Sequence, residues 1–461
     1  MADAMIDDVR LAPDELEAAG IRTVIVATPD LQGRLVGRRI PVEGFGRVVE
    51  NGVDICTCAW AWDIDQGLEL IDANKFALCG MHNGVPDVTL IPDLETLRPA
   101  AWLEGVAICL ADPVDVHTHE PMPLSPRVLL KQELARIREL GLTPLAGTEL
   151  EFYLFRNDPR ELRRSGFRDL DPTTLTPSDF MIHEGNLYEP FFQKLRADLR
   201  ASGILVEAAQ SEWGLGQWEM TFEYGDPLEM ADRHALYKLA VRDTAARAGM
   251  SATFMARPLN DQPGSSCHVH VSFVDDESTA VFWDESAPDR LSGRMRSAIA
   301  GALEHAPALM AWYAPTVNSY RRSNSSDVAG SGQTWGFDNR TTTVRVVGHS
   351  PQALRFEFRL PGADTNPYFT LTGVLASARD GMEKATVLGD AVVGSAYDLP
   401  ADGAMPADPR QASILFGESP LVQELLTPEL ISHQQVLLDH EWTTFMARVT
   451  DWDLHRYFDR I

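Results

Sequence analysis

Two carboxylates stand two residues apart inside an apolar stretch of the sequence. Glu149 and Glu151 lie in "GTELEFYLF", residues 147–155. Because residues i and i+2 of a β-strand point to the same side, both acids share one face while Leu150 and Phe152 share the other. The stretch therefore predicts a strand that packs on one face and carries charge on the other.

Three further segments show the same alternation. Their polar positions are Glu219 in residues 216–222, His268, His270 and Ser272 in residues 267–273, and Arg355, Glu357 and Arg359 in residues 355–360. A solvated outer face of an antiparallel sheet is the ordinary reason for alternation. Solvated faces mix Thr, Lys, Gln and Ser, whereas these concentrate Glu, His and Arg. We therefore favour the interpretation that the polar faces converge on one cavity.

Such a cavity would gather five carboxylates, those of Glu149, Glu151, Glu212, Glu219 and Glu357. Like charges close together in a low dielectric cost several kcal/mol unless the acids are protonated or neutralised by cations. Carboxylates with an imidazole, and no required thiolate, suit a hard divalent ion. We expect Mg²⁺ or Mn²⁺, with two or more ions per site.

Arginines supply the opposite charge. Those near the polar segments are Arg322, Arg340, Arg345, Arg355 and Arg359. Guanidinium groups hold carboxylate and phosphate oxygens bidentately, so metals together with arginines indicate phosphoryl transfer. The sequence has no Gly-Lys pair and hence no Walker A loop, and "GLGQWE" and "GSGQTWG" lack the spacing of a dinucleotide fingerprint. Any ATP site is therefore of another kind.

Composition limits the remaining possibilities. The chain has 461 residues, 44% of them hydrophobic, which indicates a globular protein of one large domain with an appendage, or of two to three domains. A formal charge of −27 argues against nucleic acid and anionic membranes as partners. The five cysteines are odd in number and lack CxxC spacing, so we expect neither a disulfide framework nor a zinc knuckle. Without a signal peptide or a spanning apolar run, a cytoplasmic protein is expected.

The elements that must position these residues follow from the periodicity. Residues 21–28 read as a strand, and residues 50–120 form a small, mostly β unit. Ser125 and Pro126 then start a helix that ends at Gly141. Later strands alternate with helices at 228–248 and 291–312, which is an α+β pattern. The Ser- and Gly-rich residues 321–334 are expected to form a mobile loop, a common form of active-site lid.

Several motifs, in order, resemble those of the glutamine synthetase family over essentially the full length. They are "GTELEF" at 147–152, "VEAAQSEWGLGQWE" at 206–219, "ATFMARPL" at 252–259, "GSSCHVHVS" at 264–272, "NSYRR" at 318–322, "NRTTTVR" at 339–345 and "RFEFRLPGADTNPY" at 355–368. The resemblance implies a β-grasp domain over residues 1–120. It also implies a catalytic domain over residues 121–461, with curved antiparallel strands around a funnel. Stacked six-membered rings, a homododecamer, would place active sites between neighbouring subunits.

The resemblance also implies roles for individual residues. One metal would be held by Glu151, Glu212 and Glu219, and a second by Glu149, His268 and Glu357. ATP would be met by Glu207, His270, Ser272, Arg345 and Arg355, and glutamate by Gly264, Arg322 and Arg359. Arg340 would face the transferred phosphate, and Asp63 and Asp65 lie where the family supplies an aspartate that helps to deprotonate ammonia. The implied chemistry is formation of γ-glutamyl phosphate followed by attack of an amine.

One segment departs from the family pattern. Ammonia-using members carry a Glu in the flap after "NSYRR", whereas this flap reads "SNSSDVAGSG", with Val328 at that place and Asp327 beside it. Losing the acid weakens an ammonium site and leaves room for a carbon tail. We therefore expect a ligase of glutamate with ethanolamine or a polyamine, resembling the γ-glutamylethanolamide and γ-glutamylpolyamine synthetases. Two alternatives stay open: glutamine synthesis from ammonia, with Asp327 replacing the Glu, and a structural or regulatory homologue without turnover.

Overall fold

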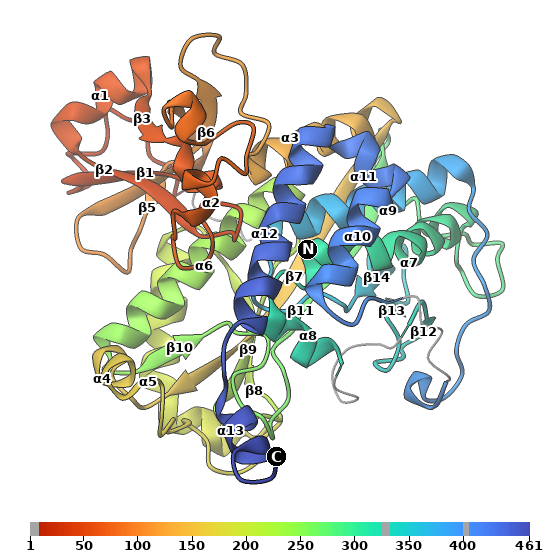
Figure 1. Ribbon diagram of the computed structural model, residues 1–461. Coiled ribbons are helices and arrows are strands. Elements are labelled where there is room, and N and C mark those ends of the chain that lie inside the picture. The colour runs from red at the N-terminus through yellow and green to blue at the C-terminus, as the bar shows by residue number, and fades with distance from the viewer. Residues whose placement is uncertain (1–8, 325–331, 400–404) are drawn as a thin grey trace.

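The computed structural model describes residues 9–324, 332–399 and 405–461 (Figure 1). Two sheets, each with helices packed against it, make up an α+β architecture, as the sequence predicted. In Figure 1 the N-terminal sheet lies to one side of a larger body in which helices surround the second sheet. Within the described part of the chain, no helix is long and apolar enough to cross a membrane.

The N-terminal sheet has the strand order β2-β1-β6-β4-β3, and β5 also pairs with β6. Its strands are β1 (Thr23–Pro29), β2 (Leu35–Pro41), β3 (Val53–Cys56), β4 (Asp87–Pro92), β5 (Arg98–Pro99) and β6 (Val106–Asp115). β1 pairs in parallel with β6, and its nearly continuous apolar run fits a strand covered on both faces. Helix α1 (Val42–Asn51) buries Phe45 and Val48 against this unit.

The larger sheet has the order β12-β13-β14-β11-β7-β9-β8, with β10 paired to β7. Its strands are β7 (Leu142–Phe155), β8 (Val206–Ser211), β9 (Gln217–Phe222), β10 (Ser251–Thr253), β11 (Cys267–Asp275), β12 (Trp335–Phe337), β13 (Val344–Val347) and β14 (Arg355–Phe358). All neighbours are antiparallel except β12 and β13, which are parallel. The curved antiparallel sheet that the resemblance implied is thus present, with one parallel pair at its edge, where residues 338–343 return the chain to the starting end before β13 begins.

Helices lie around the larger sheet (Figure 1). They are α3 (Pro126–Glu139), α4 (Pro159–Ser165), α5 (Ile182–Ala201), α6 (Pro227–Arg247), α7 (Gly293–Tyr313), α8 (Val317–Ser323), α9 (Pro367–Lys384), α10 (Pro409–Glu418), α11 (Pro420–Leu425), α12 (Pro428–Met446) and α13 (Asp451–Tyr457). The side chain of Ser125 caps α3 by accepting from Val128 N, with Pro126 in the first turn, which confirms that predicted start. Short helices α2 (Glu69–Asp72), η1 (Thr57–Trp60), η2 (Met81–Asn83), η3 (Leu94–Thr96) and η4 (Ala396–Asp398) lie in connections.

Glycines permit the closest helix crossing. α7 and α9 approach so tightly that a Cβ built on Gly301 would lie 2.2 Å from the carbonyl oxygen of Ser377, and one on Gly381 would lie 2.2 Å from that of Ser297. Side chains larger than hydrogen would force the helices apart. This crossing therefore fixes two of the helices that cover the sheet.

Buried ion pairs join the N-terminal strands to the helices of the larger unit. Arg127 of α3 contacts Asp93 at 2.9 Å and Asp112 at 2.8 Å, and it contacts Asp232 of α6 at 3.0 Å. Tyr368 Oη donates to the same Asp232 at 2.7 Å. The two units are thus cross-linked by a shared polar network. The boundary predicted near residue 121 stays a prediction.

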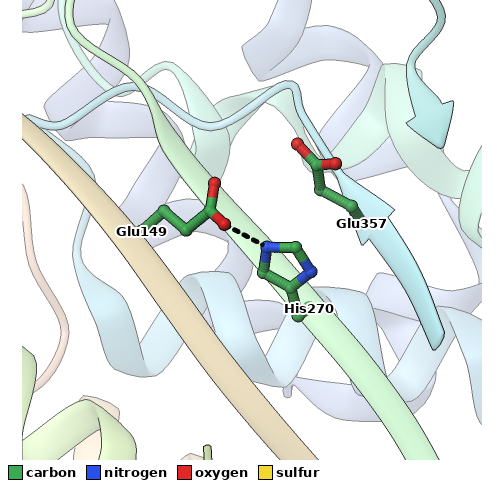
Figure 2. Close-up of side chains that lie close together, drawn as sticks. All are labelled: Glu149, His270 and Glu357. Carbon is green, nitrogen blue, oxygen red and sulfur yellow. Dashed lines mark hydrogen bonds and ion pairs between the residues drawn. The ribbon is translucent and has the colours of Figure 1, made fainter. Parts of the chain in front are cut away.

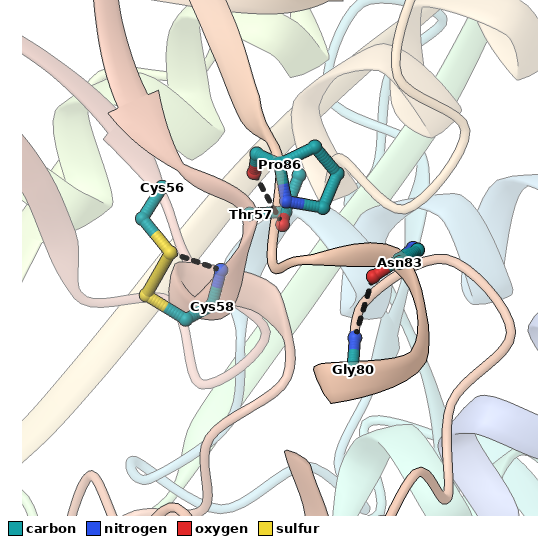
Figure 3. The surroundings of a disulfide bond; sticks show 6 residues. All are labelled: Cys56, Thr57, Cys58, Gly80, Asn83 and Pro86. Carbon is teal, nitrogen blue, oxygen red and sulfur yellow. Dashed lines mark hydrogen bonds between the residues drawn. A yellow bond between two sulfur atoms is a disulfide. The ribbon is translucent and has the colours of Figure 1, made fainter. Parts of the chain in front are cut away.

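A disulfide links Cys56 and Cys58 where β3 passes into η1 (Figure 3). Cys58 N also donates to Cys56 Sγ at 3.1 Å, and the neighbouring Thr57 Oγ1 donates to the Pro86 carbonyl at 2.7 Å. Cysteine spacing did not indicate this single bond, in which a turn within three residues brings the Cα atoms to 5.2 Å, within disulfide reach. The other three cysteines are free and buried.

Candidate active site

Strand β7 is paired with β11 along one edge and with β9 along the other, so its polar face lies between the polar faces of those two strands. On one edge Glu149 lies opposite His268 of β11, and on the other Glu151 lies opposite Glu219 of β9. The register of β11 with β14 places Glu357 opposite His270. The polar faces of four strands therefore converge, as their alternation predicted.

Glu149 lies between two histidines. Its carboxylate is 2.8 Å from His270 Nε2 and 3.2 Å from His268 Nδ1. Arg355 Nε donates to His270 Nδ1 at 3.1 Å, so Nε2 carries the proton that is donated to Glu149. Figure 2 shows Glu149, His270 and Glu357 reaching toward one another from three strands. Although burial opposes ionisation, these histidines lower the pKa of Glu149 well below its usual range.

Glu357 is also held ionised. Arg345 contacts one of its oxygens at 2.9 Å, while Arg359 and, at 3.5 Å, His268 contact the other. Burial raises the pKa of this carboxyl, but the charges of His268 and Arg359 outweigh burial and lower it to about 2. Glu357 is therefore a permanent anion between cationic neighbours.

Two further acids of the cluster, Glu212 and Glu219, lie near Glu151 and have raised pKa values. Glu151 accepts from Gln217 Nε2 at 2.7 Å and from Ser266 N at 2.9 Å, and Glu219 accepts from Gln210 Nε2 at 2.7 Å. Burial and the Glu151 charge raise the pKa of Glu219 to about 10. The same two causes raise the pKa of Glu212 to about 8. These carboxyls would ionise fully only beside a bound cation.

The donor set fits divalent metal. Two overlapping groups, Glu149 with His270 and Glu357, and Glu149 with Glu219 and His268, each bring ligand atoms within 4.8 Å of one another. His268 Nε2 is buried and has no hydrogen-bond partner among the described residues. Carboxylate oxygens with imidazole nitrogens match Mg²⁺ and Mn²⁺.

These groups differ in part from the sets that the family resemblance implied. His270, which was expected at ATP, lies within ligand distance of Glu149 and Glu357. Glu151 belongs to neither group of described residues because Gln217 and Ser266 hold its carboxylate. The division of ligands between two ions therefore stays a prediction.

Two adjoining cavities, of about 680 and 290 Å³, share Glu149, His270 and Arg355 in their walls. The larger is also lined by Arg345, and the smaller by Glu207 and Ser272. All the residues expected at ATP thus lie on one continuous region beside the acid cluster. Arginines next to ordered carboxylates provide suitable contacts for metal-bound phosphates.

The residues expected at glutamate also lie together. Arg322 donates to the Leu360 carbonyl at 2.7 Å and, through its other terminal nitrogen, to Ser266 Oγ at 2.9 Å and to the Arg359 carbonyl at 3.2 Å. A Cβ on Gly264 would lie 2.6 Å from Arg322 Cγ, so only glycine fits there. Two guanidinium groups therefore flank one end of the acid cluster.

Asp179, which the sequence reasoning did not single out, lies close enough to Glu212 for its charge to raise the pKa of that acid. Ser211 Oγ donates to the Ser178 carbonyl at 2.5 Å and Phe180 N donates to the Ser211 carbonyl at 3.1 Å, which fixes the segment beside Glu212. Burial raises the pKa of Asp179 and the charge of Arg340 opposes this rise. Its one sequence signal is an acid in a loop of Pro, Thr and Ser, which is weak.

Two expected residues, Asp63 and Asp65, lie elsewhere. Asp63 contacts His440 of α12 at 3.3 Å, and its cavity shares no lining residue with the two cavities at Glu149. Asp65 lies in the same turn, where its N donates to Asp63 Oδ1 at 3.0 Å. Within one chain, neither aspartate reaches the acid cluster, and their role stays a prediction. Asp327 and Val328 lie outside the described residues.

A curved sheet that gathers carboxylates, imidazoles and arginines on one polar face defines a metal-dependent enzyme that acts on anions. The family model for the catalytic domain of glutamine synthetase matches residues 123–457. The chain belongs to the glutamine synthetase family.

Individual relatives match over nearly the whole length. The chain is 36% identical to gamma-glutamylethanolamide synthetase GlnA4 of Streptomyces coelicolor, over 97% of this chain and 95% of that protein. It is 33% identical to glutamate–isopropylamine ligase of a Pseudomonas species, over 97% of each. The solved structure of ligand-free GmaS superposes with a TM-score of 0.83 at 26% identity, over 97% of this chain and 99% of that one.

Proposed function

We propose that the protein joins the γ-carboxyl group of glutamate to a small primary amine at the expense of ATP. The observation that carries this proposal is the combination of the acid–arginine site with full-length similarity to two glutamate–amine ligases. As the amine substrate, ethanolamine or another alkylamine is favoured over ammonia.

The residues divide the reaction between two ends of the site. Arg345 and Arg355 hold the phosphates of ATP, while Arg322 and Arg359 hold glutamate. The γ-carboxylate oxygen attacks the γ-phosphorus and ADP leaves, which gives γ-glutamyl phosphate. Two groups of residues would hold divalent ions: Glu149 with His270 and Glu357, and Glu149 with Glu219 and His268. When bound, such ions would neutralise the charge of the phosphates. Arg340 faces the transferred group and stabilises its added negative charge.

The amine then attacks the acyl carbon, the C–N bond forms, and phosphate leaves. A primary amine is an ammonium ion near neutral pH, so it must be bound as a cation and must lose protons before attack. Asp179, whose charge acts on Glu212, would bind that cation. Asp327, Asp63 and Asp65 stay candidates for the base.

One assay tests the proposal. Phosphate release from ATP with Mg²⁺ and glutamate should be measured with ammonium, ethanolamine, methylamine, isopropylamine, putrescine and spermidine. We expect an alkylamine to give a kcat/KM at least about tenfold above that of ammonium. Activity with ammonium alone would establish glutamine synthesis instead, and no turnover with any amine would favour a structural or regulatory homologue.

We further propose Mg²⁺ or Mn²⁺ as the metal, two or more per site, a cytoplasmic location and a homododecamer of two stacked rings. The family resemblance supports the assembly, and α13 offers an unburied surface for subunit contact, with Trp452 and Phe458 exposed. A mass near twelve times 51.0 kDa in light scattering is expected. A monomeric mass would contradict it.

A further inference from the structure

A cavity of about 430 Å³ lies where the N-terminal unit meets the larger unit. Its walls come from the turn between β1 and β2, from Asp63 and Ile64, and from helices α6 and α12, which lie close together in Figure 1. It shares no lining residue with the cavities at Glu149. A ligand in this interdomain cavity would therefore contact none of the residues that line the cavities at Glu149.

One wall of the interdomain cavity is cationic. Arg242 of α6 lines it, with its guanidinium carbon 5.5 Å from the centre of the Phe254 ring. Among the described residues, no carboxylate forms an ion pair with Arg242. Burial and the charge of Arg34 lower the pKa of Arg242. A guanidinium has five N–H donors, so this wall offers an unused anion contact.

Lys238 adds a second cation, one helical turn before Arg242. Its Nζ donates to the Ala363 carbonyl at 2.9 Å and lies 5.4 Å from the centre of the Phe254 ring. Burial lowers the pKa of Lys238 to about 8, and the Arg242 charge adds to this while Asp364 opposes it. Arg34 differs from both, because Asp30 neutralises it at 2.7 Å. Among the described residues, neither Lys238 nor the exposed Arg242 forms an ion pair with a carboxylate, although the partly buried Asp364 lines the same cavity.

Another part of the lining is acidic. Glu441 of α12 accepts from Val317 N at 3.1 Å, and Asp63 contacts His440 at 3.3 Å. Burial and the charge of Asp63 raise the pKa of Glu441, as expected when acids crowd without a cation. Apolar side chains, including those of Leu239 and Leu437, also line the cavity.

We propose that the interdomain cavity binds a small zwitterionic amino acid. Arg242 and Lys238 hold its carboxylate. Asp63 and Glu441 hold its ammonium group, and the apolar lining contacts its carbon chain. The cavity volume is in the range of small-ligand sites. An ordinary amino acid and a γ-glutamyl amide share this charge pattern, and both are small enough to be tested as ligands.

The walls belong to both units, so an occupant would strengthen their contact and raise the melting temperature. This inference does not depend on amine ligation. The amine panel reports on the catalytic site, whereas binding to the interdomain cavity can be measured without turnover.

Calorimetry on the full chain tests the proposal, with L-glutamine, γ-glutamylethylamide and succinate as probes. The background is Arg359→Ala, in which the catalytic glutamate site is weakened. We expect one site per chain for the two zwitterions, and binding of succinate at least about tenfold weaker because it lacks an ammonium group. Tighter binding of the amide than of glutamine would identify the substituted amide as the preferred class, and the reverse would identify ordinary amino acids.

Added variants locate the site. Arg242→Ala and, separately, Glu441→Gln should each weaken binding at least about tenfold. The second change keeps an acceptor for Val317 N, so it tests the charge even if the first variant fails to fold. Arg247→Ala is the control, since Arg247 is on the same helix but donates to the Trp102 carbonyl outside the cavity. No binding in the Arg359→Ala background, or equal binding by all variants, would overturn the proposal.

Discussion

Glu219 is the acid whose removal best separates chemistry from folding. Its carboxyl is buried among other acids and its pKa is raised to about 10, so it adds little to the stability of the metal-free protein. We expect Glu219→Ala to reduce kcat more than about 100-fold, because removing a metal ligand should lower activity more than removing a residue that only hydrogen-bonds to a ligand. Its melting temperature without metal should be unchanged or higher.

Phosphate release and thermal melting of the same preparation check this expectation. Glu223→Ala, an exposed acid just after β9, is the control and should keep activity. A Glu219→Ala protein that lost its cooperative melt would instead identify Glu219 as structural.

The protonated acids also predict a pH dependence. The folded-state pKa values of Glu212 and Glu219 lie above the ordinary value of 4.5, so the metal-free fold binds extra protons and loses stability as pH rises toward 10. Bound Mg²⁺ would take the place of the protons on Glu212 and Glu219. The rise in melting temperature caused by Mg²⁺ should therefore grow between about pH 6 and about pH 9. If the rise in melting temperature caused by Mg²⁺ stayed constant across that pH range, both in the wild type and in Glu219→Gln, the raised pKa values of Glu212 and Glu219 would be contradicted.

Asp179 carries a prediction about charge recognition. Asp179→Asn should raise the KM of a charged alkylamine about tenfold, which corresponds to about 1.4 kcal/mol, and leave the KM of glutamate unchanged. Hydroxylamine, which is neutral near pH 7, should be affected much less. Initial rates with both nucleophiles make the test, and the exposed Asp169→Asn in the same segment is the control. Equal effects on both nucleophiles would exclude recognition of charge.

Strand geometry explains which site residues could be predicted. Side chains at alternate positions of one strand share a face, so Glu149 could be placed with Glu151, and His268 with His270, from spacing alone. Asp179 could not, because its loop reaches Glu212 through hydrogen bonds to Ser211 that no local pattern encodes. The division of ligands between two ions stays a prediction, since it depends on the direction in which Glu151 turns when metal is bound.

At the scale of elements, the crossing of α7 and α9 depends on glycine. Gly301→Ala should lower the free energy of unfolding by about 1–3 kcal/mol, because its Cβ would meet the Ser377 carbonyl. Gly293→Ala on the same helix has open space around the new methyl group and should be neutral or stabilising by up to about 1 kcal/mol. Chemical denaturation of the two variants compares them. Equal stabilities would show that the crossing can relax.

Elements with strong local signals were predictable. Helix α3 begins at the Ser–Pro pair as expected, and β7, β9, β11 and β14 contain the alternating segments. The parallel pairing of β12 with β13 was not predictable, because these strands have three and four residues and their partners are chosen by tertiary packing. The Cys56–Cys58 bond depends likewise on a local turn that spacing rules for CxxC do not include.

At the scale of the whole molecule, Arg127 joins the two units. It is almost fully buried and contacts three aspartates, so Arg127→Met would leave Asp232 buried without its cation. We expect a loss of about 3–5 kcal/mol in the free energy of unfolding. Lys131→Met removes a more exposed cation from Asp93 and Asp112 and should cost less than about 1 kcal/mol. Urea unfolding measures both, and similar losses would argue against a special role for the buried network.

Pairing along both edges has a further consequence for strand β7. A single-residue insertion between residues 148 and 150 could not be absorbed by sliding, because β9 and β11 fix the register. Every side chain beyond the insertion would change sides, so that Glu151 would turn toward the apolar helices and a leucine would replace it in the site. Length changes in this protein's lineage should therefore be confined to its loops, whatever substrate its descendants come to use.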